Sequence, residues 1–272
     1  MRSPKLEILI STMHRTDLSF LFAMCKEIQP EACTFLIVNQ TMEDRLLTSP
    51  YNNIRVINSF EKGLSKSRNL ALQHAIGNIC LIADDDTLFI PGFDRTIKQA
   101  FKNYNAALIT FQVATFEGTP YRKYRNNPGI VTRHRDIEDL SSVEMAFRRK
   151  PITDHALMFN ERFGLNSDFE MGEEYLFARD VLRSGLGVAY LPEKIVKHSR
   201  LTSTSDYGHD KVLYAKGALS SIKHPYTTVL WLIKFVFFLA RKGYIRWTEA
   251  AAKLRIALQG IRDHKKLSKF TQ

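Results

Sequence analysis

Three consecutive carboxylates, Asp84, Asp85 and Asp86, directly follow an apolar stretch at residues 79–83. Like charges this close repel and raise one another's pKa, so a cation is expected beside them. Hard oxygen ligands suit Mg²⁺ or Mn²⁺, and a metal held by one or two carboxylates with open positions typically binds substrate phosphates. An Asp-rich turn, in which the side chains hydrogen-bond to backbone amides, explains the same residues. Taken alone, the motif leaves a metal site and a turn equally open.

A glycine followed by a basic segment lies upstream, at residues 63–69, Gly-Leu-Ser-Lys-Ser-Arg-Asn. Gly63 stands before the N-terminus of an expected helix, and Arg68 falls in its first turn or just after it. Backbone amides, the helix dipole and a guanidinium together suit a phosphate group. A capped surface helix whose basic side chains face water has the same sequence, and the segment taken alone favours that interpretation.

Two adjacent acidic residues, Glu173 and Glu174, open an expected helix that Gly185 ends. Carboxylates at a helix N-terminus are stabilised by the macrodipole, which is one explanation for their position. The other is a general base held on a rigid element. His198, at the end of an expected strand that begins at Val188, is more often structural in such a position, but it could also be a ligand completing a metal shell begun by the aspartates.

The elements that must position these groups alternate along the first half of the chain. Strands are expected at residues 6–11, 34–38, 54–57, 79–83 and 106–113, and helices at residues 18–28 and 65–75. Ser65 is expected to cap the second helix and Gly77 to end it. This order predicts an α/β fold with a mostly parallel sheet and right-handed crossovers, whose ligands bind beyond the carboxyl ends of the strands. The three aspartates lie at such an end.

The composition is that of a globular protein, with 272 residues, 44% hydrophobic and 25% charged. Cys25, Cys33 and Cys80 show no metal spacing, and the last two lie in apolar runs, which favours reduced, buried thiols in a cytosolic protein. Residues 1–7 are polar and predict no signal peptide. Residues 117–135 are rich in Gly, Pro, Asn, Tyr and Arg without periodicity, and we expect a mobile loop there, beside the site.

The net charge of +11 is concentrated in the C-terminal part of the chain. From Arg200 to Gln272 there are 14 Lys/Arg and 4 Asp/Glu, a net charge of +10, which leaves +1 for residues 1–199. The same part holds residues 229–240, apolar except for Lys234 and too short for the roughly 20 residues that span a bilayer. A basic, Trp- and Phe-rich helix of this kind either lies in the interface of an anionic membrane or packs on the domain. We therefore expect a domain at residues 1–199 and a basic helical extension at residues 200–272.

These motifs, in this order, resemble the family 2 glycosyltransferases with the GT-A fold, a Rossmann-like sheet flanked by helices. The resemblance covers roughly residues 5 to 200. The matching features are Ser11, Thr12 and Arg15 after the first strand, Asn39 ending the second, the segment from Gly63 to Asn69, the three aspartates with Pro91 five residues on, the Phe-Asn-Glu-Arg-Phe-Gly segment at 159–164, the Gly-Glu-Glu helix start and the late His198.

The resemblance implies a role for each matching residue. A nucleotide sugar would be bound by Thr12, Arg15, Asn39, Gly63, Arg68, Asn69, Asp84 and Asp85. Asp86 would bind Mn²⁺ or Mg²⁺, and His198 would bind the same metal or the diphosphate. Glu174 would be the catalytic base, and Glu173 would contact the acceptor or support the base.

Two residues depart from the family pattern. Many relatives have Asp where this chain has Asn39, which leaves the nucleotide base less certain. The acidic pair is Glu-Glu rather than Glu-Asp, which lengthens the presumed base by one methylene, and a misplacement of about 1 Å can cost about 10²-fold in rate.

The resemblance implies an inverting hexosyltransferase that uses a UDP-sugar and a glycan or lipid-linked acceptor in surface polysaccharide biosynthesis. The enzyme would be cytoplasmic and peripheral on the inner face of an anionic membrane. The alternatives are a GT-A module that binds a nucleotide sugar or glycan without transfer, a basic nucleic-acid-binding protein and a nucleotidyltransferase. Residues 1–199 are nearly neutral, which disfavours a nucleic-acid-binding protein. The sequence has no Gly-rich N-terminal loop, which disfavours a nucleotidyltransferase.

Overall fold

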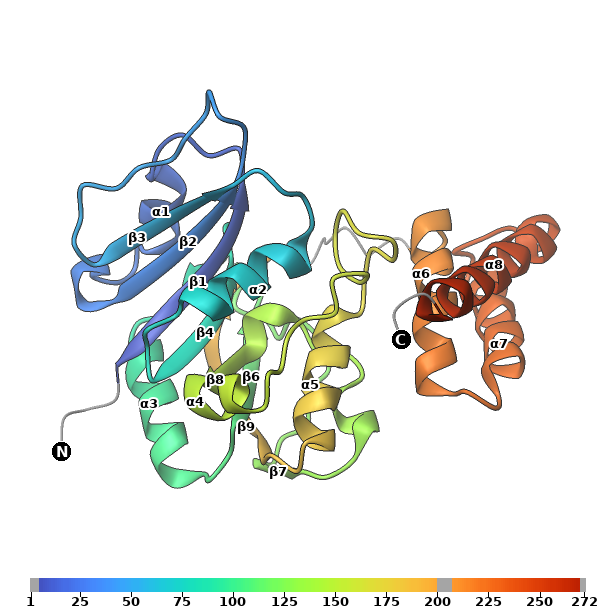
Figure 1. Ribbon diagram of the computed structural model, residues 1–272. Coiled ribbons are helices and arrows are strands. Elements are labelled where there is room, and N and C mark those ends of the chain that lie inside the picture. The colour runs from blue at the N-terminus through green and yellow to red at the C-terminus, as the bar shows by residue number, and fades with distance from the viewer. Residues whose placement is uncertain (1–4, 200–206, 270–272) are drawn as a thin grey trace. The chain divides into compact units, whose positions relative to one another are not determined.

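The computed structural model of the chain describes residues 5–199 and 207–269 (Figure 1). The expectations for residues 1–4 and for a boundary at Arg200 lie outside these residues. The chain divides into two compact units, one of Met1–Asn160 with Glu174–Arg200 and the other of Glu161–Glu173 with Leu201–Gln272. Residues 161–173, which the sequence-based division assigned to the N-terminal domain, therefore belong with the C-terminal helices.

The first unit is built on one mixed sheet of nine strands within the described residues. The strands are β1 (Leu6–Met13), β2 (Thr34–Gln40), β3 (Ile54–Ser59), β4 (Ile79–Asp84), β5 (Leu88–Phe89), β6 (Leu108–Ala114), β7 (Gly129–Val131), β8 (Met145–Arg148) and β9 (Val188–Lys197). Their order is β3-β2-β1-β4-β8-β6-β9-β5, with β7 paired to β9. The predicted α/β fold with a largely parallel sheet is confirmed, and the antiparallel pairings all involve the short strands β5, β7 and β8.

The parallel register of β3, β2, β1 and β4 aligns polar residues at the carboxyl ends of these strands. Ser11 of β1 lies opposite Asp84 of β4. Thr12 lies opposite Asn39 of β2, which in turn lies opposite Asn58 of β3. The register therefore places the residues that the sequence singled out along one edge of the sheet.

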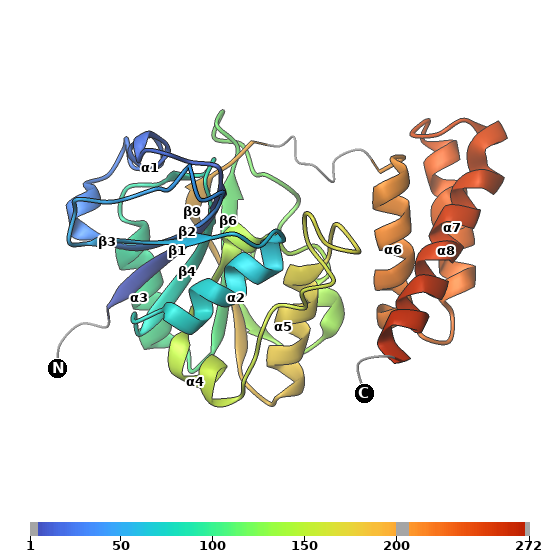
Figure 2. The ribbon, with the colours of Figure 1, turned by 45° about the horizontal axis from the view of Figure 1, so that its top comes forward.

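Helices cover both faces of this sheet (Figure 2). They are α1 (Ser19–Met24), α2 (Leu64–His74), α3 (Phe93–Asn103), α4 (Arg149–Asp154) and α5 (Glu173–Arg183), together with three short 3₁₀ helices within the described part of this unit. Successive side chains of a strand point to opposite faces, so every second residue lies on the same face. Ile8 and Ile10 of β1 are such residues, and they form one apolar core with residues of α1 and α3. The helix α2 packs on β1 and β2, and Figure 2 shows α2 and α5 on the face away from α3.

Several local predictions need correction. The helix expected at residues 18–28 is only the six residues of α1. Gly63, with φ of 125°, precedes α2, so Ser65 lies inside the helix and is not its cap. The helix ends at His74, before Gly77, whose amide is bound by the buried carboxylate of Glu7.

The segment at residues 117–135 has more structure than the predicted mobile loop. It contains β7, and Arg122 and Tyr124 hydrogen-bond to the fully buried carboxylate of Glu144 at 2.7–3.1 Å. A buried charge requires such partners, so the base of this segment is held in place.

The cysteines are free thiols. Cys25 and Cys80 are buried, and burial raises the pKa of Cys25 to about 12. Cys33 is only partly buried, which corrects its expected full burial. The raised pKa values keep these thiols protonated and unreactive at neutral pH.

The second unit packs three helices, α6 (Asp210–Lys223), α7 (Thr228–Arg241) and α8 (Ala250–Lys269), with residues 161–173. The ring of Phe169 lies against Tyr214 and His264, with centroid distances of 5.4 and 5.8 Å. Lys211 of α6 binds Glu170 at 3.1 Å. Among the described residues, no helix has the length and hydropathy of a membrane span.

Two glycines allow α6 and α8 to approach closely. A Cβ atom added to Gly217 would lie 1.9 Å from the carbonyl oxygen of Ala257, and one added to Gly260 would lie 2.0 Å from that of Tyr214. Both contacts are with backbone, which cannot move aside without separating the helices.

We predict that Gly260→Ala destabilises the protein although alanine has the higher helix propensity. The clash with Tyr214 backbone should lower the free energy of unfolding by about 1–3 kcal/mol. Circular dichroism during thermal unfolding measures this, with Gln259→Ala on the exposed neighbouring position as control. Equal stability of Gly260→Ala and the control would show that the helices are less tightly packed.

Candidate active site

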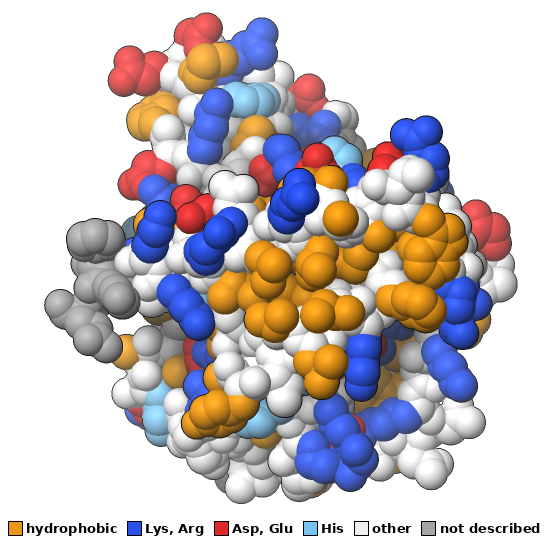
Figure 3. Space-filling view, turned by 90° about the vertical axis from the view of Figure 1, so that its right-hand side faces the viewer, with side chains coloured by type: hydrophobic (Ala, Val, Ile, Leu, Met, Phe, Trp, Pro, Cys, Tyr) orange, Lys and Arg blue, Asp and Glu red, His pale blue; other side chains and the backbone are white. Residues whose placement is uncertain are grey.

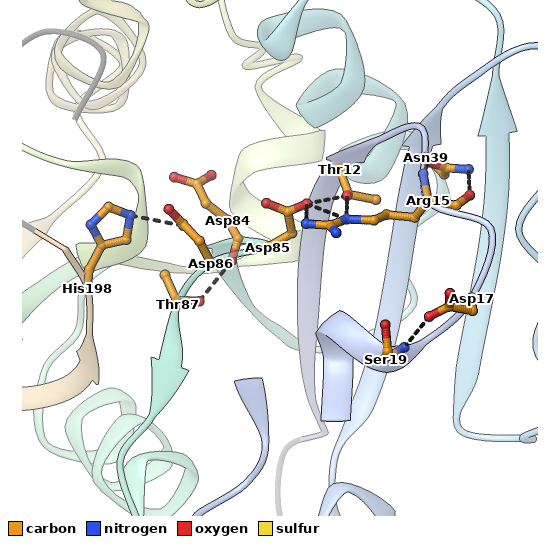
Figure 4. Close-up of polar contacts among 10 residues, drawn as sticks. All are labelled: Thr12, Arg15, Asp17, Ser19, Asn39, Asp84, Asp85, Asp86, Thr87 and His198. Atoms are coloured by element: carbon orange, nitrogen blue, oxygen red, sulfur yellow. Dashed lines mark hydrogen bonds and ion pairs between the residues drawn. The ribbon is translucent and has the colours of Figure 1, made fainter. Parts of the chain in front are cut away.

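The three aspartates at the end of β4 have three different sets of partners. Figure 4 shows two of them, Asp85 with Thr12 and Arg15, and Asp86 with His198. Asp85 accepts hydrogen bonds from the Thr12 hydroxyl at 2.5 Å and from Arg15 Nε and Nη2 at 3.0 and 2.8 Å. The side chain of Arg15 is 42% exposed. Asp85 therefore orients a cationic group that still faces solvent and has hydrogen-bond donors to offer a ligand.

Asp84 is joined to the buried Arg68. Arg68 Nη2 donates to Asp84 Oδ1 at 3.2 Å, and the hydroxyl of Ser142 donates to Asp84 Oδ2 at 3.2 Å. The Arg68 side chain is only 2% exposed, and its guanidinium lies over the ring of Phe159, 5.5 Å from the centroid. The structure thus places Arg68 behind the aspartates, where it neutralises charge, and not at the surface.

The same guanidinium reaches the predicted base. Arg68 Nη1 lies 3.8 Å from Glu174 Oε1, and the Glu174 side chain is 19% exposed. Arg68 therefore links the predicted metal motif to the predicted base, two segments 90 residues apart in the sequence (84 and 174). One buried guanidinium therefore lies within ion-pair distance of two carboxylates.

Asp86 pairs with His198. The Nε2 atom of His198 lies 3.0 Å from Asp86 Oδ1. The hydrogen bond from His198 holds the pKa of Asp86 below its ordinary value. Burial opposes a charged imidazole, yet the bond to Asp86 and its negative charge raise the pKa of His198. The two residues form an ion pair whose carboxylate is 61% exposed at its side chain.

Asp86 and His198 have the chemistry to hold a divalent cation only if its remaining ligands are water or substrate oxygens. In the described residues, no three His, Cys, Asp or Glu side chains converge on one point. Mg²⁺ and similar ions are commonly held by one or two protein carboxylates together with water and substrate phosphates. Asp86, in the turn after β4, supplies one exposed carboxylate, and His198, directly after β9, supplies one imidazole.

Asn39 is fully buried and binds protein groups. Its side-chain oxygen accepts from the Arg15 amide at 3.1 Å, and its Nδ2 donates to the Arg15 carbonyl and to Asn58 Oδ1 at 2.9 and 3.0 Å. Asn58 in turn binds both backbone groups of Leu47. In this structure Asn39 positions the loop that carries Arg15.

Gly63 and Asn69 also have structural partners. The carbonyl of Gly63 accepts from the side chain of Gln40 at 3.0 Å. The amide side chain of Asn69 exchanges two hydrogen bonds, of 2.9 and 2.7 Å, with the backbone of Phe159. Asn69 thus holds the Phe159 ring against Arg68.

The acidic pair is placed by a glycine. Gly172 has a φ of +96°, which side chains rarely adopt, and a Cβ atom there would lie 2.6 Å from the side chain of Leu219. Glu173, which follows, is buried, whereas Glu174 is partly exposed. Of the two, Glu174 is the one that solvent reaches.

Comparison with known proteins adds the family. The sequence model described as "Glycosyl transferase family 2" matches residues 39–164. These residues are similar to a family 2 glycosyltransferase domain. The match begins at Asn39 and includes the three aspartates, Arg68 and Ser142. No curated protein sequence matches the chain at a significant level.

Solved structures with the same fold come from S. aureus TarS. The structure of TarS 1-349 has a TM-score of 0.55 at 13% identity, with 98% of this chain and 92% of that chain covered. A longer TarS structure has a TM-score of 0.56 at 15% identity and covers 93% and 49%. TarS 1-349 in complex with UDP-GlcNAc has a TM-score of 0.53 at 13% identity and covers 96% and 92%. At these identities the likeness shows the fold of the glycosyltransferase domain.

Several residues near the site were not predicted. Ser142 and Phe159 contact Asp84 and Arg68, as described above, and Tyr121 lies edge-on to His198 with a centroid distance of 5.9 Å. His14 has a φ of 56°, a conformation uncommon outside glycine, next to Arg15. The positive φ of His14 has no signal in the sequence. The positions of Ser142, Phe159 and Tyr121 at the site follow from tertiary contacts, which local sequence patterns do not reveal.

We predict that Asn39→Asp, which restores the residue of many relatives, lowers the stability of the glycosyltransferase domain. A carboxylate oxygen would replace Nδ2 and face the Arg15 carbonyl and Asn58 Oδ1, which should cost about 2 kcal/mol or more in the free energy of unfolding. Thermal unfolding of this variant and of Asn52→Asp, the same change at an exposed position, measures the effect. Unchanged stability with tighter UDP binding would instead show that residue 39 turns toward the nucleotide.

Proposed function

We propose that the chain is an inverting, metal-dependent glycosyltransferase that moves a sugar from a UDP-sugar to a hydroxyl of a glycan or lipid-linked acceptor in surface polysaccharide biosynthesis. The observation that carries the proposal is the division of the three aspartates among Arg68, Arg15 and His198. That division supports separate positions for a base, a nucleotide and a cation along one edge of the sheet.

The nucleotide side is formed by Thr12, Arg15 and Asp85. Arg15 offers exposed guanidinium donors, while Asp85 and Thr12 hold its orientation. The choice of UDP is supported by the TarS structures of the same fold, which are in complex with UDP-GlcNAc and with UDP. Asn39 contributes by holding the backbone of Arg15.

The cation would be Mn²⁺ or Mg²⁺, held by Asp86 and His198. When bound, it would supply positive charge to the diphosphate as the glycosidic bond breaks. Asp86 already carries a lowered pKa, so its carboxylate is charged at neutral pH.

Glu174 is the residue that we assign as general base. Its carboxylate removes the proton from the acceptor hydroxyl while the oxygen attacks the anomeric carbon. The bond from that carbon to the diphosphate breaks, its electron pair leaves with UDP, and in-line attack inverts the anomeric configuration. Arg68, 3.8 Å from Glu174, holds the base beside Asp84, and Glu173 supports the start of α5.

We predict that Asp86→Ala removes the metal-dependent part of UDP binding. Wild-type protein should show a larger rise in melting temperature with UDP and Mn²⁺ together than with UDP alone, because a ligand bound only by the folded state stabilises it by mass action. The variant should lose this difference and at least about 10²-fold in transfer rate. Asp44→Ala, in an exposed loop, is the control. A variant that retains the Mn²⁺-dependent rise would contradict the assignment of the site.

We predict that Glu174→Gln lowers the rate of sugar transfer by about 10²- to 10⁴-fold, the usual contribution of a general base. Binding of the donor should remain, as measured by the thermal shift with a UDP-sugar. Glu31→Gln, an exposed change of the same kind, should retain full activity. Normal turnover by Glu174→Gln would rule out this base, and donor binding by an inactive wild-type protein would indicate a non-catalytic sugar-binding module.

The donor is best identified by a thermal-shift screen. UDP-, GDP- and dTDP-sugars are compared with and without Mn²⁺, and we expect the largest rise for a UDP-sugar with Mn²⁺. A larger rise with another nucleotide would reassign the base, and it would leave the roles of Asp86 and Glu174 open to the variants above.

A further inference from the structure

The helix α7 has two apolar faces, and the second unit covers only one of them. Leu232, Val236 and Leu239 are buried against α6, α8 and the turn after α7. Val229, Leu230, Ile233, Phe237 and Phe238 are 41–56% exposed. The packing of the second unit therefore does not account for this second apolar face of α7.

The exposed residues form one surface with aromatic side chains from the ends of the helix. Trp247, which is 58% exposed, contacts Phe237 edge-on at a centroid distance of 5.3 Å. Tyr226, just before α7, is 98% exposed. Figure 3 shows a broad apolar patch on this side of the molecule, bordered by Lys and Arg side chains. We call Tyr226, Val229, Leu230, Ile233, Phe237 and Trp247 the α7 surface.

The charge around the α7 surface has one sign. Between Asp210 and Glu249 the sequence has seven Lys or Arg and no Asp or Glu. Lys234 and Arg241 are exposed on α7 itself, each four residues after an α7 surface residue, so they lie beside it. A partner that covers the apolar centre must therefore also accept a cationic border.

We propose that the α7 surface is a docking site for an anionic lipid bilayer. A helix of 14 residues is about 21 Å long and does not cross a hydrocarbon core of about 30 Å. It does suit a position in the plane of the interface, with apolar side chains among the acyl chains and Lys and Arg at the headgroups. Trp247 and Tyr226 are of the residue types enriched at that depth.

Two other partners fit the surface less well. In a two-fold dimer the α7 surface would meet itself, and Lys234 and Arg241 would face like charges with no carboxylate within residues 211–248 to pair with. A nucleic acid would match the basic border, but it would leave Leu230, Ile233 and Phe237 without an apolar partner. A lipid surface satisfies both the charge and the apolar centre.

The test is co-sedimentation of the full chain with vesicles, without nucleotide sugar, so that its result is independent of the proposed transfer reaction. We expect binding to vesicles of phosphatidylcholine with 30% phosphatidylglycerol and much weaker binding to pure phosphatidylcholine. Ile233→Glu and Phe237→Glu should each weaken binding at least about tenfold, since each removes an inserted apolar group and adds a repelled charge. Ile76→Glu, in the first unit and 50% exposed, is the matched control and should bind as the wild type does.

A second measurement reports insertion directly. The chain has two tryptophans, Trp231 and Trp247, so Trp231→Phe leaves Trp247 as a single probe. The emission maximum of Trp247 should shift to shorter wavelength on addition of anionic vesicles. Part of this shift should remain in 0.5 M NaCl, because salt screens the attraction of Lys and Arg to the headgroups but does not remove inserted apolar side chains from the bilayer.

Three results would overturn the proposal. The first is equal vesicle binding by Phe237→Glu and the wild type. The second is a wild-type dimer that Phe237→Glu dissociates, with no vesicle binding by either protein. The third is salt-sensitive binding of the chain to RNA without binding to vesicles. Circular dichroism of each variant establishes that it is folded before binding is compared.

Discussion

The parallel pairing of β1 with β2 and β4 is the constraint on which the site depends. It sets Ser11 opposite Asp84 and Thr12 opposite Asn39, and a shift of one residue would turn each of these side chains to the other face of the sheet. The strands can hold this register because their inner residues are fully buried on both faces, which fixes the apolar pattern. Burial of Ile8, Leu36 and Leu81 thus determines where the charged groups emerge.

Electrostatics then divides the charged groups that the register brings together. Three adjacent carboxylates are stable at one strand end only when each has its own cation or donor, and Arg68, Arg15 and His198 fill these roles from three different parts of the chain. Among these three cationic groups, Arg68 is the one that is buried and that pairs with two carboxylates, those of Asp84 and Glu174. Its contact with Phe159, which Asn69 holds in place, gives the guanidinium a fixed position between them.

The sequence predicted β1, β2, β3, β4 and β6 and the position of the aspartates at a strand end, because apolar periodicity and strand ends are local properties; it did not predict the short strands β5, β7 and β8, whose pairing depends on distant segments. It also proposed Asp86 with His198, which the structure brings to 3.0 Å. It did not distinguish residues that face a ligand from residues that hold them. Asn39, Arg68 and Asn69 were assigned to the nucleotide sugar on the motif alone, yet their side chains are buried on protein partners. That distinction depends on burial, which is set by segments such as residue 159 that lie far away in the sequence.

The division into two units gives the proposed base an unusual connection. The helix α5 carries Glu174, and its first residue, Glu173, is the last residue of the segment 161–173 that packs among the C-terminal helices. Glu170 pairs with Lys211, and Gly172 fits against Leu219 with no space for a side chain. The helices α6 and α8 that hold this segment also bury the inner face of α7, so that one small unit both fixes the start of the base-bearing helix and presents the α7 surface. The closest approach of α6 and α8, at Gly217 and Gly260, leaves no space for a methyl group, so the packing on which both features depend tolerates little change.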